Sequence, residues 1–454
     1  MTPSMCGGPM RRREFLRLGT LALGGLALPE LLAARAASGQ SSADTSVILF
    51  WMWGGPSQLE TYDCKPDAPS EYRGPLRPIH TTAPGLDVCE VFPLQAKLGH
   101  RMSLVRSLHH KMSSHNDGSI EVLTGKTPAK EDPTSTAKSD HPDFGMITSR
   151  LRGPSPTGLP RYVGVPRVPF MVQPTYLGMV HSGFASGDPS APKFRPPNLS
   201  LDAGVGGARL DDRRSLVAQL DRYRRAHDLF GAVEASGSFR EQAFQLLTST
   251  SVADAFALDQ ERPQTRDHYG RHLWGQSCLL ARRLAESGAS VITIDALSPV
   301  PTNPIYFSWD DHSNPATGWN LEGAMRWRAP FMDQGLSALI EDIYDRGLDR
   351  KIMVVAVGEF GRTPRLASPQ GVLGRDHWPA AQSAMISGGG LRMGQVVGAT
   401  TSKAEYPVDR PLSPKDLLAT MYRHLGIDYR GTINDFTGRP VHILSDGEPI
   451  RELI

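Results

Sequence analysis

Cysteine is scarce in this chain: four of its 454 residues are cysteines, and no Cys-x-x-Cys spacing occurs. This scarcity excludes a small fold held together by several disulfides, and also a zinc or redox site of the Cys-x-x-Cys type. Cys6 lies in the expected leader described below, so Cys64, Cys89 and Cys278 remain. Three thiols allow one disulfide and one free cysteine. Cys64 and Cys89 are the closest pair in sequence, but sequence alone does not fix the pairing.

An excess of charge of either sign is missing as well. The chain has 49 Lys and Arg against 47 Asp and Glu, a formal net charge of +2. The expected leader, residues 1–36, contains five Arg and two Glu and carries +3, which leaves the rest of the chain near −1. This balance gives no support for binding to nucleic acid or to an anionic membrane surface. With 39% hydrophobic residues, the chain has the composition of a globular protein with a large core.

The one apolar stretch near the N-terminus is too short for a comfortable membrane span and has the features of an export signal. The basic segment RRREFLR at 11–17 is followed by an apolar stretch at 18–32 and by the small-residue cleavage pattern ARA at 34–36. Paired arginines before Phe-Leu match a twin-arginine signal. A membrane anchor is the alternative, but glycines interrupt the stretch. We therefore expect a signal at 1–36, a linker at 37–44, export by the twin-arginine machinery, and a mature protein without a membrane span in the periplasm or cell envelope.

Apolar segments of strand length alternate with helical patterns from residue 45 to the C-terminus. The expected strands lie at 45–53, 103–108, 290–295, 351–357 and 384–387. The expected helices lie at 92–100, 210–230, 239–258, 271–287, 331–346 and 414–425. Continuous runs such as KIMVVAV are typical of parallel strands that are buried on both faces. We predict a single α/β domain over 45–454, with a doubly wound, mostly parallel sheet, helices on both faces, and a loop-rich insertion at about 125–215.

Acidic and histidine side chains gather where these expected strands end. Sites in such folds lie in the loops beyond the carboxyl ends of the strands. Those loops contain WDDHSN at 309–314, GEFGRTP at 358–364 and GRDHW at 374–378, with His115, Glu60 and Asp63 after the first two strands. Carboxylates and imidazoles suit one or two divalent ions, either zinc, manganese, iron or calcium. The candidate ligands are Asp310, His312, Glu359, Asp376, His377, Glu60 and Asp63.

Each of these loops also has a simpler structural interpretation. Asp and His are common in Gly- and Pro-rich loops because they form turns and cap helices. Glu359 directly follows a buried strand, where a carboxylate is costly unless a cation neutralises it. That cation can be a metal ion, or it can be Arg362 or Arg375, which are also placed to hold an oxyanion. No phosphate-binding loop and no Gly-x-Ser-x-Gly motif is present.

Taken together, the motifs resemble a known bacterial exported family. The twin-arginine start resembles that family, as do GGPS at 54–57, ETYD at 60–63, LTG at 123–125 and the three acidic loops named above. The family is called domain of unknown function 1501 and is similar to the alkaline phosphatase and sulfatase superfamily. The resemblance implies an alkaline-phosphatase-like fold, a one-metal or two-metal site, and hydrolysis of phosphate or sulfate esters.

The resemblance also assigns roles, with two departures. Asp310 and His312 match the superfamily's Asp-plus-His loop, and Glu359 and His377 match further ligand positions, with Asp376 beside the latter. The nucleophile of sulfatases lies eight residues before a Leu-Thr-Gly, and that position is His115 here, which is neither a hydroxyl nor a thiol. The usual Asp after the first strand is replaced by Trp-Gly-Gly at 53–55, so Glu60 or Asp63 are the expected substitutes.

Two functions of different classes follow from these patterns. The first is an exported hydrolase of anionic phosphate or sulfate esters, in which a metal-activated water attacks, Arg362 binds a charged oxygen, and His115 is a ligand or general base. The second is a metal-stabilised binding or scaffold protein of the cell envelope without turnover, with the loops at 125–215 as its ligand or partner surface.

Overall fold

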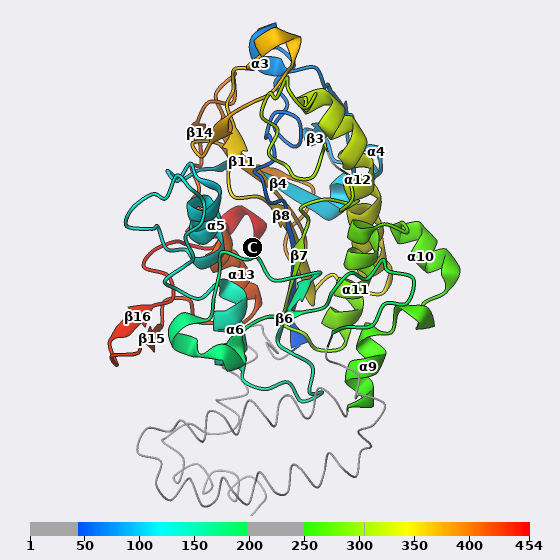
Figure 1. The fold of residues 1–454 in the computed structure, drawn as a ribbon, viewed down its shortest axis with the longest axis vertical. Helices are drawn as coiled ribbons and strands as arrows, with labels where there is room; N and C mark the ends of the chain where they lie inside the picture. Colours follow the sequence, from blue (N-terminus) through cyan, green and yellow to red (C-terminus); the bar gives the residue numbers. More distant parts are fainter. Residues whose placement is uncertain (1–43, 198–248, 304) are drawn as a thin grey trace, which may run out of the picture. The chain divides into compact units, whose positions relative to one another are not determined.

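An eight-stranded sheet runs through the middle of the computed structural model, which describes residues 44–197, 249–303 and 305–454 (Figure 1). The strand order is β12 (Val396–Val397), β4 (Met102–Leu108), β11 (Gln382–Gly388), β8 (Ile352–Val357), β1 (Ser46–Trp51), β7 (Val291–Asp295), β5 (Tyr162–Val165) and β6 (Phe184–Ala185). Only β11 runs antiparallel to its neighbours in this sheet; the other pairs are parallel. This arrangement confirms the predicted α/β class with a mostly parallel sheet.

The central strands are buried on both faces, as their continuous apolar sequences predict. In β1, Val47, Leu49 and Trp51 pack into the core on one side of the sheet, while Ile48 and Phe50 pack into the core on the other. Successive side chains of a strand point to opposite faces, so both faces of a strand with no polar alternation must be covered. The sequence SVILFW therefore requires helices on both sides of the sheet.

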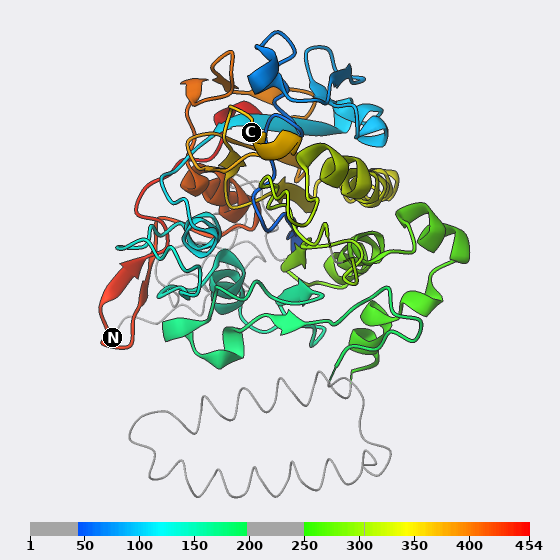
Figure 2. The ribbon, with the colours of Figure 1, turned by 45° about the horizontal axis from the view of Figure 1, so that its top comes forward.

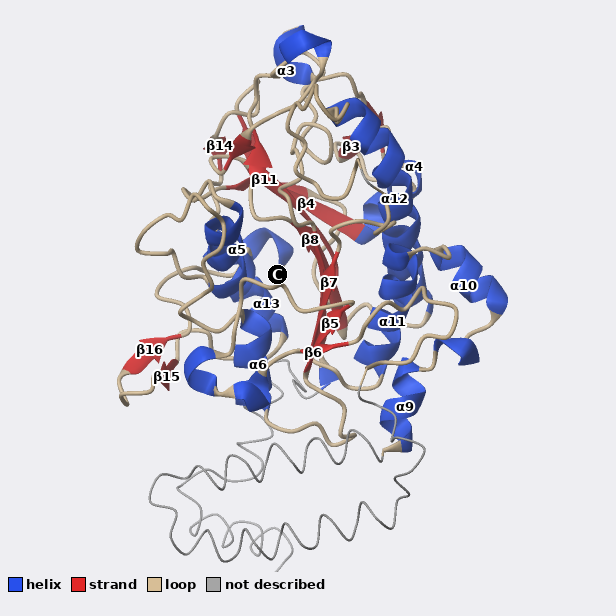
Figure 3. Cartoon of the chain, viewed as in Figure 1, coloured by secondary structure: helices blue, strands red, loops and turns tan. Residues whose placement is uncertain are grey.

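Helices supply that cover in two layers (Figures 1 and 3). One side carries α4 (Pro93–Ala96), α9 (Thr250–Phe256), α10 (Pro263–Tyr269), α11 (Leu273–Glu286) and α12 (Leu321–Asp345). The other side carries α5 (His115–Thr124), α6 (Phe144–Arg152) and α13 (Pro414–His424). The two groups stay apart in the turned view of Figure 2. Among the described helices, none has both the length and the apolar composition needed to cross a bilayer.

Element boundaries differ from the predictions mainly at proline. Helix α12 was expected to begin after Pro330, yet it begins at Leu321 and contains Pro330 in its interior. An interior proline removes the hydrogen bond to the carbonyl four residues earlier, here that of Arg326. Leu321, Met325 and Ala329 lie on the buried face before the proline, and their burial offsets that loss.

The loop-rich region contributes to the sheet itself. Its described part, up to residue 197, contains α6, and its strands β5 and β6 extend the sheet beyond β7. The helix expected at 210–230 lies outside the described residues, and only the end of the one expected at 239–258 lies inside them, as α9. In the part of the chain that the structure describes, four two-stranded pairs lie outside the main sheet: β2 (Pro78–His80) with β3 (Asp87–Cys89), β9 (Gly361–Arg362) with β10 (His377–Trp378), β13 (Ala399–Thr400) with β14 (Pro407–Asp409), and β15 (Thr432–Asn434) with β16 (Pro440–His442).

The three described cysteines are free thiols. Cys64 and Cys89 were the pair expected from proximity in sequence, and their side chains are hydrogen-bonded to each other rather than joined by a disulfide. That hydrogen bond, together with burial, raises the pKa of the Cys64 thiol well above its usual range. Cys278 is fully buried in α11, where burial also raises the pKa of its thiol.

Replacing Leu336 with Ala tests the packing of α12 on the sheet. Leu336 is fully buried in the core, so Leu336→Ala is expected to lower the free energy of unfolding by about 2–5 kcal/mol. The matched control is Leu151→Ala in α6, where 46% of the leucine surface is exposed; its cost should stay below about 1 kcal/mol. Chemical denaturation measures both, and equal losses would contradict this packing.

Candidate metal centre

Four chain segments meet beyond the carboxyl ends of β1, β7 and β8. Asp310 and His312 come from the loop after β7, and Glu359 comes two residues after β8 ends. His377 lies on β10, which pairs with β9 so that His377 is opposite Arg362. Parallel strands place their carboxyl ends at one edge of a sheet, so distant segments converge there.

His115 enters this group as the first residue of α5. Ser114 is the N-cap of the helix: its hydroxyl donates to the Asp117 carboxylate at 2.8 Å and accepts from the Asp117 amide at 3.4 Å. The capped first turn directs the His115 ring between two carboxylates. Its Nδ1 lies 2.7 Å from Glu359 Oε1, and its Nε2 lies 3.3 Å from Asp310 Oδ2.

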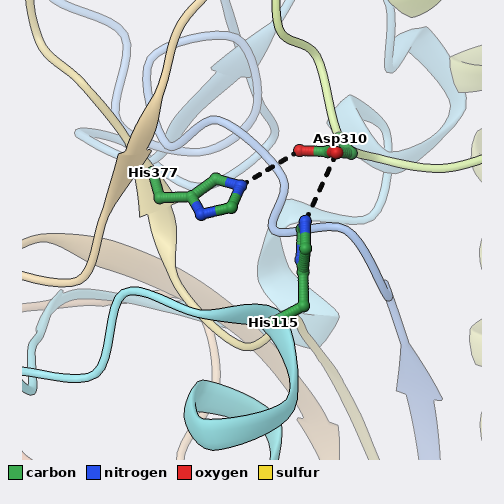
Figure 4. A group of neighbouring side chains, drawn as sticks. All are labelled: His115, Asp310 and His377. Carbon is green, nitrogen blue, oxygen red and sulfur yellow. Dashed lines mark hydrogen bonds and ion pairs between the residues drawn. The ribbon is translucent and has the colours of Figure 1, made fainter. Parts of the chain in front are cut away.

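Asp310 is the centre of the group. Figure 4 shows its carboxylate between the rings of His115 and His377, which come from a helix start and a short strand. Its Oδ1 lies 3.2 Å from His377 Nε2 and 3.0 Å from His312 Nε2. The ligand atoms of His115, Asp310 and His377 all lie within 4.8 Å of one another, a spacing that one metal ion can bridge.

The partners of the outer ring nitrogens assign the tautomers. His377 Nδ1 lies 2.6 Å from the Ser113 carbonyl oxygen, which can only accept, so Nδ1 carries the proton. His312 Nδ1 faces the Asp376 carboxylate at 2.8 Å, and His115 Nδ1 faces Glu359. In the neutral form, all three rings therefore present an Nε2 lone pair toward Asp310.

A hydrogen-bond partner on Nδ1, with Nε2 facing the site, is the pattern by which proteins orient histidine ligands. The His312 and His377 Nε2 atoms lie 3.0 Å apart, both beside the same carboxylate oxygen. Lone pairs and a negative charge at these distances repel one another unless positive charge lies among them. The group therefore binds either protons or a metal ion, and the spacing of His115, Asp310 and His377 allows one divalent ion to use the ligand atoms of all three.

The pKa shifts describe the same attraction for positive charge. Burial alone would lower the pKa of His115, but its hydrogen bonds to Asp310 and Glu359 raise it to about 9. The hydrogen bond to Asp310 raises the pKa of His312, whereas burial lowers that of His377. Burial opposes ionisation of Asp310, but its histidine and arginine partners hold its pKa well below the usual range.

Arg362 has a different place from the one predicted. It was expected to bind a charged oxygen of the substrate, yet its side chain is fully buried. Its Nη2 donates to Asp310 Oδ1 at 2.5 Å and to the Gly54 carbonyl, and its Nε donates to the Gly55 carbonyl at 2.8 Å. Its Nη1 donates to the Arg375 carbonyl. Because all three guanidinium nitrogens bind other parts of the protein, Arg362 holds Asp310 in place rather than contacting a substrate.

Glu359, predicted as a metal ligand, contacts His115 instead. Its Oε1 accepts from His115 Nδ1 and, at 2.8 Å, from the Gly54 amide, while Oε2 is buried without a hydrogen-bond partner among the described residues. Gly54 has φ +116°, and a Cβ there would lie 2.6 Å from the Trp309 and Asp310 amide nitrogens. Only glycine allows the first loop to approach both Glu359 and the Asp310 loop so closely.

Glu60 and Asp63 are not brought to the group. Both are fully buried, and each is neutralised by arginine or lysine. Glu60 accepts from Arg375, whose Nη2 lies 2.8 Å from its Oε1, and Asp63 pairs with Lys65 at 2.9 Å. Arg375, which was considered as a cation for Glu359, therefore pairs with Glu60 instead. Neither Glu60 nor Asp63 replaces the missing Asp after the first strand.

Other contacts that shape the site were not predicted. Asp311, next to Asp310, is buried and accepts from Arg328, and also from Trp319 Nε1 at 3.1 Å. Phe360 is buried beneath two of the histidines, with ring centroids 4.4 Å from His377 and 5.3 Å from His115. The one sign of this aromatic contact in the sequence was the apolar Phe that follows Glu359.

Breaking the Asp311–Arg328 pair is expected to unfold the Asp310 loop and destabilise the domain. Arg328 is fully buried, so Arg328→Met leaves an unpaired buried carboxylate and should cost about 3–5 kcal/mol of unfolding free energy. Arg326→Met is the matched control, because Arg326 is half exposed and binds Glu322 and Glu90 at the surface; its cost should stay below about 1 kcal/mol. Denaturation curves that coincide for the two variants would refute this role.

Comparisons with known proteins place the chain in a family. Three similar solved structures each share 11% sequence identity with this chain. The match to the lipoteichoic acid synthase LtaP from Listeria monocytogenes covers 91% of this chain and 80% of that chain, with a TM-score of 0.39. The match to the PsFucS1 sulfatase from Pseudoalteromonas sp. covers 92% of this chain and 72% of that chain (TM-score 0.35), and the match to the phosphonate monoester hydrolase SpPMH from Silicibacter pomeroyi covers 90% and 76% (TM-score 0.31). Among curated proteins, no sequence matches. The model of the family described as "Protein of unknown function (DUF1501)" matches residues 44–454, and the chain therefore belongs to that family.

Proposed function

We propose that this protein is an exported, metal-dependent hydrolase of phosphate or sulfate esters. The observation that carries the proposal is the arrangement of three imidazole Nε2 atoms around the Asp310 carboxylate, each held by a partner on its Nδ1. The motifs that resemble the alkaline phosphatase and sulfatase superfamily supply the class of substrate.

The donor set fits a transition-metal ion. His115, Asp310 and His377 form the inner set, and His312, whose side chain is the most exposed of the four, completes it on the solvent side. Three nitrogen donors and one oxygen donor suit zinc, manganese or iron, whereas calcium prefers oxygen ligands. Glu359, Asp376 and the Ser113 carbonyl then orient the ligating rings.

The chain's own residues prepare the site for attack by water. A bound divalent ion would polarise the ester oxygen and lower the pKa of a water molecule. Glu359 fixes the His115 ring, and Arg362 fixes the Asp310 carboxylate, so neither ligand has to reorganise during the reaction. His115 is engaged on both ring nitrogens, which supports water, and not a side chain, as the nucleophile.

Export remains part of the proposal on the sequence alone. The segment RRREFLR at 11–17 and the ARA pattern at 34–36 support a cleaved twin-arginine signal, and they lie outside the described residues. A folded precursor would carry its metal ion across the membrane, which agrees with ligands contributed by segments far apart in the chain.

Metal content tests the site directly. Asp310→Ala and His377→Ala are each expected to lose about one tightly bound ion per chain, as measured by elemental analysis of the purified protein, together with ester hydrolysis. The matched controls, Asp345→Ala and His80→Ala, change exposed residues away from the group and should keep the wild-type stoichiometry. Full metal content in both site variants would reject the centre. Bound metal without hydrolysis of any phosphate or sulfate ester would leave the binding or scaffold function instead.

Glu359→Gln tests the orienting role of that carboxylate. The substitution removes the charge that holds His115 Nδ1–H but keeps the shape of the side chain, so metal affinity or kcat/KM is expected to fall by about 10–100-fold. Circular dichroism should confirm an unchanged fold. A variant with wild-type metal affinity and wild-type kcat/KM would show that Glu359 does not act through His115.

A further inference from the structure

Two aromatic side chains continue from the metal centre toward the surface. The Trp53 ring centroid lies 5.1 Å from that of His115, with the planes tilted by 31°. Phe170 packs edge-on against Trp53 at 6.1 Å between centroids, and 46% of its surface is exposed. His115, Trp53 and Phe170 thus form a continuous strip, called the aromatic strip below.

The strip is built by the same edge of the sheet as the metal centre. Trp53 lies two residues after the end of β1, and Phe170 lies in the loop that follows β5. Trp53 also accepts a hydrogen bond at its carbonyl from the Trp309 amide, at 3.2 Å, just before Asp310. A single exposed phenylalanine needs no explanation. Here the exposed Phe170 ring packs edge-on against Trp53, whose ring lies beside that of His115, so apolar surface extends from a proposed metal ligand to the solvent.

An arginine lies three residues before Phe170. The Arg167 Nε donates to Asp295 Oδ2 at 2.5 Å, and 52% of the Arg167 side chain is exposed. Asp295 is the buried last residue of β7 and lies opposite Trp51, the last residue of β1, at the edge of the sheet where the metal centre lies. No hydrogen bond from the two Nη groups of Arg167 is seen among the described residues, so this guanidinium keeps donors for a ligand. Arg362, in contrast, is fully buried, and each of its three guanidinium nitrogens donates to another described residue.

We propose that the aromatic strip and Arg167 bind the alcohol part of the ester, and that this part is a ring with an apolar face that carries a second anionic group. The proposal rests on the proposed function and deepens it by naming the substrate class. An aromatic side chain packs against either an aryl ring or the C–H face of a sugar ring. A planar guanidinium suits a carboxylate, phosphate or sulfate on that ring.

The first experiment compares the ratio of kcat/KM for two esters between variants, because the intrinsic reactivity of each ester cancels in that comparison. The kcat/KM ratio of phenyl phosphate to methyl phosphate is compared between wild type, Phe170→Ala and the control Phe436→Ala. Phe436 is 80% exposed in the turn between β15 and β16. The ratio should fall about 10-fold in Phe170→Ala, which corresponds to the loss of one aromatic contact, and should stay at the wild-type value in Phe436→Ala. An unchanged ratio in Phe170→Ala overturns the strip.

A second pair of substrates tests Arg167 and separates the two kinds of ring. Arg167→Met should lower the kcat/KM ratio of 4-carboxyphenyl phosphate to phenyl phosphate by about 10-fold, and an unchanged ratio overturns the anion-binding role. Glucuronate 1-phosphate and 4-carboxyphenyl phosphate compare a sugar ring with an aryl ring. The substrate whose kcat/KM falls more in Phe170→Ala shows whether the natural ester carries a sugar ring or an aryl ring.

Binding measurements keep this proposal separate from the hydrolase itself. If wild type hydrolyses neither these phosphate esters nor the corresponding sulfate esters, the proposed function fails, and calorimetry of phenyl phosphate and methyl phosphate binding to the full chain then tests the strip. Tighter binding of phenyl phosphate that is lost in Phe170→Ala supports the subsite. Equal binding of the two probes overturns it. Hydrolysis with no effect of Phe170→Ala overturns the subsite and leaves the hydrolase intact.

Discussion

The contact between the Asp310 carboxylate and the buried Arg362 guanidinium sets the geometry of the whole site. Arg362 cannot leave, because it also donates to the Gly54, Gly55 and Arg375 carbonyls, so one cation joins the first loop, the Asp310 loop and the β9–β10 pair. His115, His312 and His377 each place a ring nitrogen next to this fixed carboxylate. A charge that is expensive to bury is tolerated because each of its neighbours carries or can accept positive charge.

Five acidic residues predicted or found at this edge of the sheet fall into two groups according to the side chains around them. Glu60, Asp63 and Asp311 each face a permanent cation and are structurally complete. Glu359 faces an imidazole, and Asp310 faces imidazoles in addition to Arg362; the charge of these imidazoles depends on what else is bound. That difference separates carboxylates that stabilise the fold from those that remain available for chemistry, and it explains why acidic loops of similar sequence have different roles.

The sequence predicted what local pattern and strand topology determine. Buried Val and Ile runs required a sheet covered by helices on both faces, and acidic and histidine side chains at strand ends were expected to converge, as Asp310, His312 and His377 do. It did not predict pairings between distant residues. Arg375 and Glu60 are 315 positions apart, and His115 and Glu359 are 244 apart, so no spacing shows which acid meets an arginine and which meets an imidazole. Helix α12 was shortened in the prediction because local propensity at Pro330 does not register the burial before it.

The two-residue pairing of β9 with β10 has a consequence for how this family can diverge. His377 lies opposite Arg362, so one short ladder fixes both the imidazole that faces Asp310 and the cation that holds it. Successive strand residues alternate sides, and a single deletion within either strand would turn His377 away from the carboxylate. The exposed turn at 368–371, within the connection between the two strands, carries no such phase requirement. Variation in length should therefore accumulate in this turn and be absent from the two strands.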